Sequence, residues 1–143
     1  MVDKPAGIPV TPTRLFFEHS LLHLLRAKTK NKNLSPLHRL DQETSGLTAF
    51  AKKPKARGFY QRQFQQKKVT KVYLAMVFGH VDPELTSIDL PLGRHDQIYT
   101  RFIPDPTGKP AKTKVEKVVH EGEYSLLRLR PVTGRTHTRQ MGT

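Results

Sequence analysis

The stretch that decides the fold is Val72-Tyr73-Leu74-Ala75-Met76-Val77, an almost unbroken run of apolar and aromatic side chains. Strands with one face in water alternate apolar and polar residues, whereas strands covered on both faces read as continuous apolar runs. We therefore expect a strand over residues 69–78 that is buried on both faces and lies at the centre of a sheet.

Weaker strand patterns follow this run along the chain. Residues 88–92 and 98–103 have strand-like composition. Residues 112–120 and 124–130 are separated only by Glu121-Gly122-Glu123, which predicts a β-hairpin. Because strands joined by such short connections pair antiparallel, we expect a mainly antiparallel sheet.

Two helices and one further strand are expected before the central run. Leucines recur at helical spacing over residues 18–28, and Pro54 can begin a second helix, since its missing N–H costs little at the first position. The apolar face of that second helix would consist of Ala56, Phe59, Tyr60 and Phe64. Residues 47–51 read as a strand. Together these elements predict an α+β fold, in which helices pack on one side of a mainly antiparallel, mixed sheet.

Both ends of the chain read as interrupted elements. Met1-Val2-Asp3 has the character of the last residues of a strand. A helix that begins at Thr136 has too few residues left to bury a useful face. We expect a single domain over residues 1–143, in the form of a fragment that lacks its first strand and its C-terminal strands and helix.

The charge of the chain favours a polyanionic partner. Of 143 residues, 25 are Lys or Arg and 12 are Asp or Glu, which gives a formal net charge of +13. Basic side chains that neutralise phosphates release condensed counterions, which drives binding to nucleic acids; a solvated basic surface is the alternative. The absence of cysteine excludes disulfides, zinc–thiolate sites and thiol nucleophiles. With no signal peptide or membrane span in the pattern, we expect a cytoplasmic protein.

Functional groups concentrate in the segment His38-Arg39-Leu40-Asp41-Gln42-Glu43-Thr44-Ser45-Gly46. In an extended backbone, Arg39 and Asp41 project to the same side, where the guanidinium favours the ionised carboxylate. An ionised Asp41 suits nucleophilic attack or stabilisation of a sugar cation, and it is poorly suited to act as a general acid. Alternatively, Asp41 caps the turn through Ser45 and Gly46 while Arg39 holds it in place. The spacing favours neither reading over the other.

A series of ordered segments, spread over nearly the whole chain, resembles the motifs of the RluA-type pseudouridine synthases. His38-Arg39-Leu40-Asp41, followed by Thr44-Ser45-Gly46, resembles the signature loop of that family. The other matching segments are Asp3-Lys4-Pro5-Ala6-Gly7, Lys71-Val72-Tyr73-Leu74-Ala75, Gly108-Lys109-Pro110-Ala111-Lys112-Thr113 and Arg130-Pro131-Val132-Thr133-Gly134-Arg135-Thr136-His137. The resemblance implies one pseudouridine synthase catalytic domain with an incomplete form of that fold.

The resemblance also implies an activity, namely the isomerisation of uridine to pseudouridine in ribosomal or transfer RNA after the uridine is flipped out of the stack. Asp41 matches the catalytic aspartate, which acts on the ribose or the base while the base detaches, rotates and rejoins through carbon. Tyr73 matches the tyrosine that stacks on the target base, and Arg39 matches the side chain that fills the gap in the RNA. Contacts with substrate or RNA are implied for His38, Arg39, Thr44, Lys71, Arg135 and Arg139.

The last of these segments departs from the family pattern. In the family, Gly-Arg-Thr-His is followed by Gln, an aliphatic residue and an Arg that pairs with the catalytic aspartate, whereas Thr138-Arg139-Gln140 follows here. A shift by one place turns a helical side chain by about 100°, so Arg139 reaches Asp41 only if its length compensates. The alternative is a catalytically impaired, truncated relative that binds RNA electrostatically.

Two histidine pairs suggest weaker alternatives. His19 and His23 have a spacing that can bind a metal, but a third ligand is not evident, and solvated helix residues are the better interpretation. His38 and His137 suggest acid/base cleavage of an RNA backbone, which would leave the matched aspartate and tyrosine without a role. We therefore expect no metal, no nucleotide cofactor and no membrane partner, and we expect a monomer that binds RNA.

Overall fold

The computed structural model describes residues 1–13, 16–95, 97 and 102–133. Its contacts divide the chain into two compact units, Met1–Val69 and Thr70–Thr143, each with its own strands. Every strand pair among the described residues is antiparallel, and two helices accompany the strands. The expected α+β class is therefore confirmed, although the strands form several small sheets in place of one.

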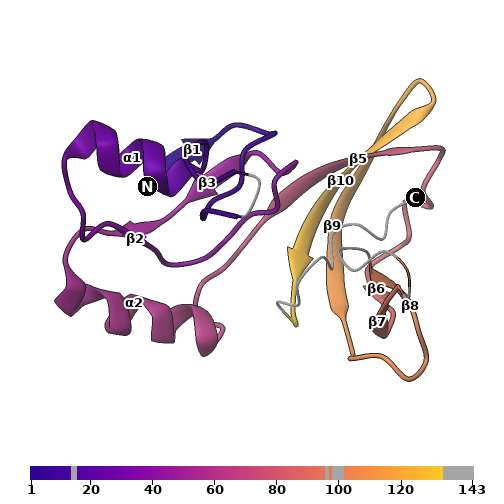
Figure 1. Ribbon diagram of the computed structural model, residues 1–143. Coiled ribbons are helices and arrows are strands. Elements are labelled where there is room, and N and C mark those ends of the chain that lie inside the picture. Colours follow the sequence, from indigo (N-terminus) through magenta and orange to yellow (C-terminus); the bar gives the residue numbers. More distant parts are fainter. Residues whose placement is uncertain (14–15, 96, 98–101, 134–143) are drawn as a thin grey trace. The chain divides into compact units, whose positions relative to one another are not determined.

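The first unit contains both helices and two short strand pairs (Figure 1). β1 (Val2–Lys4) pairs with β3 (Gly46–Thr48), and β2 (Ser35–Pro36) pairs with β4 (Phe50–Ala51). The single strand predicted over residues 47–51 is thus wrong in detail. Between β3 and β4, the Ala49 carbonyl accepts a hydrogen bond from the amide of Leu37 at 2.9 Å. The predicted strand therefore pairs with β1 in its first half and with β2 in its second half.

The residue at the start of each helix determines where that helix begins. α1 (Leu21–Thr29) starts later than predicted, because Ser20 is its N-cap and the Ser20 hydroxyl accepts a hydrogen bond from the amide of His23 at 3.3 Å. α2 (Pro54–Gln65) begins at the predicted proline. Its apolar face is covered only in part: Ala56 and Phe64 are half-buried, whereas Phe59 and Tyr60 are exposed and pack edge to face with each other, with ring centroids 5.2 Å apart.

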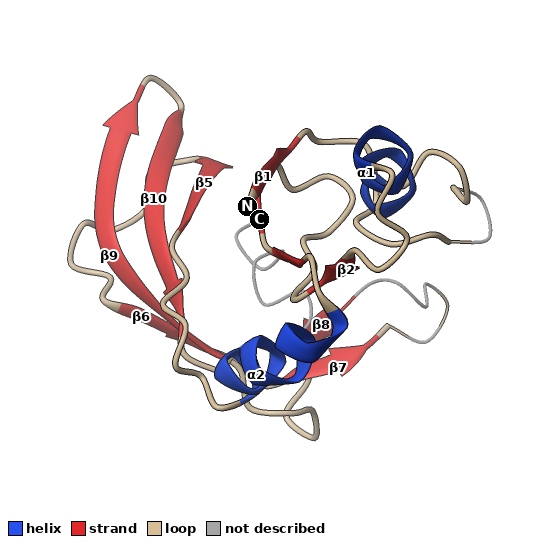
Figure 2. Ribbon diagram, turned by 90° about the vertical axis from the view of Figure 1, so that its left-hand side faces the viewer, coloured by secondary structure: helices blue, strands red, loops and turns tan. Residues whose placement is uncertain are grey.

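The second unit is built on a long hairpin (Figure 2). Its main sheet has the order β5 (Tyr73–Phe78), β10 (Tyr124–Pro131), β9 (Lys112–Glu121) and β6 (Ser87–Asp89). The predicted hairpin is confirmed in β9 and β10, and Gly122 takes the positive φ of 60° that its tight turn requires.

A smaller strand pair completes the described part of the second unit. β7 (Leu92–Arg94) pairs with β8 (Phe102–Pro104), which is the end of the strand predicted over residues 98–103. The rest of that predicted strand, and the helix predicted from Thr136, lie outside the described residues.

One face of the main sheet carries the core of the second unit. Val77, Val115, Leu127 and Leu129 are buried there, and Tyr73 packs against them. The prediction that the 69–78 strand is central and buried on both faces is wrong: β5 lies at the edge of the described sheet, and its outward side chains are exposed, namely Leu74, Met76 and Phe78. The pleat sends alternate residues to opposite faces, and the buried cluster of this unit covers only one of them.

This arrangement predicts that two leucines on the sheet differ sharply in their contribution to stability. Leu127 is 2% exposed in the core, whereas Leu74 is 72% exposed on the opposite face. Leu127→Ala should lower the free energy of unfolding by about 2–5 kcal/mol, because it leaves a cavity. Leu74→Ala should change it by less than about 1 kcal/mol. Urea denaturation checks both, and equal losses would contradict the assigned core face.

Candidate active site

Asp41 lies on the loop between β2 and β3. The Leu40 side chain is buried, whereas Arg39 is exposed and Asp41 is partly exposed, so the side chains on either side of Leu40 avoid the interior as an extended backbone predicts. The amide of Thr44 donates to the backbone carbonyl of Asp41 at 3.1 Å. This backbone bond closes the turn that follows Asp41.

The loop is attached to the N-terminal segment by Lys4. This lysine is fully buried at the end of β1. Its Nζ donates hydrogen bonds to the carbonyl oxygens of Pro5 at 2.7 Å, Ile8 at 2.7 Å and Gln42 at 2.9 Å. A neutral amine has only two N–H groups, so three carbonyl partners require the protonated, three-donor form. One buried cation thus ties the residue after Asp41 to the turn that follows β1.

A second connection joins the same two segments. The amide of Gly7 donates to the carbonyl of Gln42 at 2.9 Å, and the Gln42 side-chain amide donates back to the carbonyl of Gly7 at 3.1 Å. Gly7 has a φ of 89°, a conformation that favours glycine and lets the turn approach the loop. Together with the Lys4 bonds, this pair fixes the backbone next to Asp41.

The electrostatics of Lys4 connect it to the acidic side chains of the loop. Burial lowers the pKa of Lys4 from its ordinary value of 10.5, and the carboxylates of Glu43 and Asp41 oppose that shift. Lys4 was not among the site residues predicted from the sequence. The available signal was its position within Asp3-Lys4-Pro5-Ala6-Gly7, a segment that resembles a family motif.

His38 makes its described contacts within the protein. Its Nε2 accepts a hydrogen bond from the amide of Ala49 at 3.1 Å, and its ring stacks on Phe64 with centroids 4.8 Å apart. An accepting Nε2 carries no proton, so these contacts hold the ring in one orientation and fix the start of the loop.

The remaining predicted site residues lie in the second unit or outside the described residues. Tyr73 is partly buried, packs against the core cluster and pairs in register with Leu129. Lys71 precedes it and is also partly exposed. Arg135 and Arg139 lie outside the described residues. The structure thus gathers His38, Arg39, Asp41 and Thr44 on one loop, which is bonded to the buried Lys4. It places Tyr73 at the first position of β5 and Lys71 two residues before that strand.

Neither a metal cluster nor a membrane span is found in the described part of the chain. It contains no group of three or more His, Cys, Asp or Glu residues that could hold a metal ion. None of its helices is long and apolar enough to cross a membrane.

Comparisons with known proteins agree with the motif assignment. A family model described as RNA pseudouridylate synthase matches residues 1–140. The chain is similar to the human pseudouridylate synthase RPUSD2, with 34% identity over 137 residues that cover 96% of this chain and 25% of that protein. It is similar to the ribosomal large subunit pseudouridine synthase C of Vibrio cholerae, with 33% identity over 137 residues that cover 96% of this chain and 43% of that protein.

A solved structure agrees with these relatives. The structure of human RNA pseudouridylate synthase domain containing 1 aligns with a TM-score of 0.79 and 26% identity, over 99% of this chain and 58% of that one. The chain therefore spans between a quarter and somewhat more than half of the length of the proteins it matches.

Proposed function

This chain belongs to the RNA pseudouridylate synthase family, and on that premise we propose that it isomerises uridine to pseudouridine in RNA. The observation that carries the proposal is the setting of Asp41, which is partly exposed next to a backbone segment held by the buried Lys4. Catalysis benefits from a reacting group whose position is fixed before the substrate binds. The net charge of +13 supports RNA as the partner.

The reaction needs no external reagent. The bond between N1 of the base and C1′ of the ribose breaks, and a bond between C5 and C1′ forms. One proton leaves C5 and one is taken up at N1, so the product has the composition of the substrate. We assign to Asp41 the attack on, or proton removal from, the flipped uridine during this exchange, because an ionised carboxylate suits both roles.

The other site residues are proposed to hold the flipped nucleotide and the RNA around it. Base flipping costs a few kcal/mol. Tyr73 would recover part of this cost by stacking on the base, and Arg39 would do so by filling the gap left in the RNA. Contacts with substrate or RNA are proposed for His38, Thr44, Lys71, Arg135 and Arg139.

We place the activity in a single catalytic domain that acts as a monomer in the cytoplasm on ribosomal or transfer RNA. A relative named as a ribosomal large subunit synthase supports ribosomal RNA as a substrate class. Recognition of unpaired, splayed-out bases is the usual route to specificity in such RNAs.

The test uses RNA transcripts that carry tritium at C5 of uridine. Because the proton at C5 is lost when the new bond forms, each turnover releases one tritium into water. We expect release from ribosomal or transfer RNA transcripts and none from a DNA of the same sequence in which deoxyuridine labelled at C5 replaces thymidine. Binding of both RNAs without release would instead support a module that holds RNA by charge alone.

A further inference from the structure

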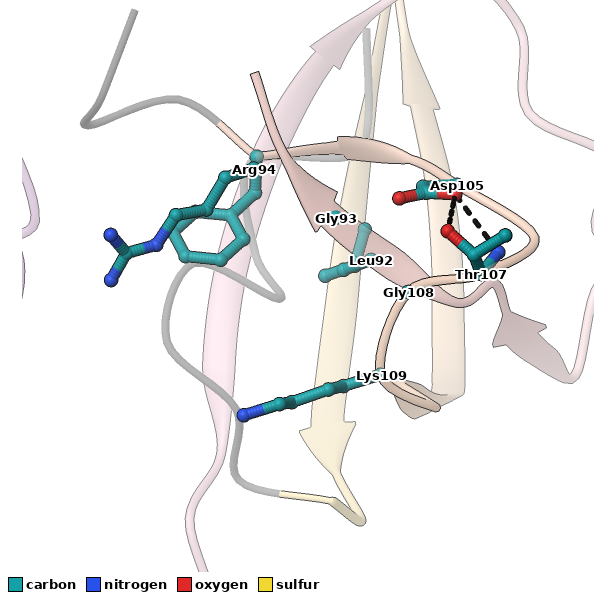
Figure 3. A pocket seen from close by; sticks show the side chains of 8 residues that line it. Leu92, Gly93, Arg94, Asp105, Thr107, Gly108 and Lys109 are labelled. Atoms are coloured by element: carbon teal, nitrogen blue, oxygen red, sulfur yellow. Dashed lines mark hydrogen bonds between the residues drawn. The ribbon is translucent and has the colours of Figure 1, made fainter. Parts of the chain in front are cut away.

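Residues of β7 and β8 and of the loop that follows β8 line an open pocket of about 480 Å³ (Figure 3). Small-molecule sites typically span roughly 300–1,000 Å³, so this space is large enough for part of a nucleotide. Its lining includes Arg94, Phe102, Asp105, Thr107 and Lys109. The proposed mechanism gives none of these residues a role, although Lys109 belongs to one of the segments that resemble family motifs.

The pocket has a fixed backbone. The amide of Leu92 donates to the carbonyl of Lys109, and the amide of Lys109 donates to the carbonyl of Leu92, both at 2.9 Å. Two close approaches require glycine: a Cβ at Gly108 would collide with the backbone of Leu92, and a Cβ at Gly93 would collide with the carboxylate of Asp105. A backbone packed this closely holds the lining residues in place, so that binding has to order only their side chains.

The charges of the pocket are separated. The Oδ1 atom of Asp105 accepts hydrogen bonds from the amide of Thr107 at 2.9 Å and from its hydroxyl at 2.8 Å, so this carboxylate is engaged by its own turn. In Figure 3, Arg94 and Lys109 extend to the opposite side of the pocket from Asp105 and Thr107. Both cationic side chains are exposed. The side of the pocket with the two cations therefore favours an anion.

We propose that this pocket binds a phosphodiester group of RNA, with Lys109 and Arg94 as its cationic contacts. The inference rests on the proposed function, which supplies the RNA. A guanidinium binds phosphate through two parallel hydrogen bonds, and an ammonium acts as a point charge. Phe102 is the cross-strand partner of Arg94 and is half-buried, which gives the neighbouring sugar or base an apolar surface.

A phosphate contact of this kind positions RNA without reading its sequence. It holds substrate and transition state equally, so its loss should raise KM and leave kcat nearly unchanged. Lys109→Gln should weaken binding of a fluorescein-labelled uridine-loop RNA hairpin by roughly threefold to tenfold near 0.1 M salt. The slope of log Kd against log salt concentration should fall by about 1. Arg94→Gln should have a similar effect.

The matched control is Lys117→Gln. Lys117 is an exposed lysine on β9, in the same unit but outside the pocket lining, so its replacement removes the same charge from the surface. We expect its effect on Kd to stay within about twofold. If Lys117→Gln weakened binding and changed the salt slope as much as Lys109→Gln does, the pocket would contribute only general surface charge and the inference would be wrong.

A titration with inorganic phosphate distinguishes a site for RNA from a site for free anions. In NMR titrations of the whole chain, the RNA hairpin should shift the amide signals of Gly93 and Gly108 at stoichiometric concentrations. Inorganic phosphate should shift them only at far higher concentrations. Saturation of both signals by phosphate at the same concentration as the hairpin would overturn the assignment to RNA.

These measurements of binding do not depend on turnover. If Lys109→Gln weakens RNA binding while the wild-type chain makes no pseudouridine, the pocket stands and the proposed function fails. If the wild-type chain makes pseudouridine and Lys109→Gln matches the Lys117→Gln control in Kd and KM, the pocket fails and the proposed function stands.

Discussion

Replacement of Asp41 by Asn is expected to lower the rate of pseudouridine formation by at least roughly 10²–10⁴-fold. Asparagine has nearly the same size but no negative charge, so it can neither attack the ribose or base nor accept a proton from them. Single-turnover release of tritium from C5-labelled RNA measures this rate directly. RNA affinity should be unchanged or slightly tighter, because the variant removes a negative charge from a surface that faces a polyanion.

Glu43→Gln provides the matched control. Glu43 is exposed on the same loop and, like Asp41, acts electrostatically on Lys4. Its replacement removes the same charge from the same neighbourhood, and we expect a rate within about threefold of wild type. Wild-type turnover by Asp41→Asn would remove Asp41 from the mechanism. An equal loss in both variants would mean that the loop needs negative charge in general and not this carboxylate.

Replacement of Lys4 by Met is expected to lower the free energy of unfolding by about 2–4 kcal/mol. The methionine fills a similar volume but removes the ammonium donor from the carbonyls of Pro5, Ile8 and Gln42, of which the Gln42 carbonyl keeps its bond from the amide of Gly7. Each buried acceptor without a partner costs about 1–3 kcal/mol. The loss falls short of the sum because the variant no longer buries a charge. Chemical denaturation of both proteins gives the difference.

The same variant should loosen the loop before it unfolds the protein. Well below the unfolding transition, hydrogen exchange at the amides of Gly7 and Thr44 should accelerate, and kcat should fall more than KM rises. The control is Lys28→Met on α1, an exposed lysine whose loss should cost less than about 0.5 kcal/mol. Equal stability and equal exchange in the two variants would show that the buried lysine does not hold the loop.

Local patterns predicted those parts of the fold that local chemistry determines. The β9–β10 hairpin follows from two strand-like runs around Gly122, and α2 follows from Pro54 at its first position. In both cases the structure of a short segment is determined by residues within that same segment. The α+β class followed from the same evidence.

Long-range contacts decided the parts that the sequence alone could not. The apolar run in β5 shows that both of its faces are apolar, but it does not show which face another element covers. Residues 47–51 look like one strand, yet Ala49 bonds to Leu37 and His38, and this divides the run between two partners. The hydrophobic periodicity of neither segment shows which face is covered or which strand is the partner.

The candidate site shows the same division. Asp41 could be proposed as a site residue from the sequence, because functional groups concentrate around it and the surrounding segments resemble family motifs. Lys4 was not, because its importance comes from carbonyl groups on two distant turns that meet only in the folded chain. The question whether Arg139 replaces the shifted arginine concerns residues outside the described part and stays a prediction.

The central claim is that this chain converts uridine to pseudouridine, and nucleoside analysis of treated RNA tests it most directly. After digestion, uridine and pseudouridine have the same mass but separate by chromatography. We predict a pseudouridine peak from wild-type protein, equal in amount to the tritium released from C5, and no such peak from Asp41→Asn. RNA that binds the wild-type chain tightly and is recovered with all of its uridine unchanged would contradict the claim.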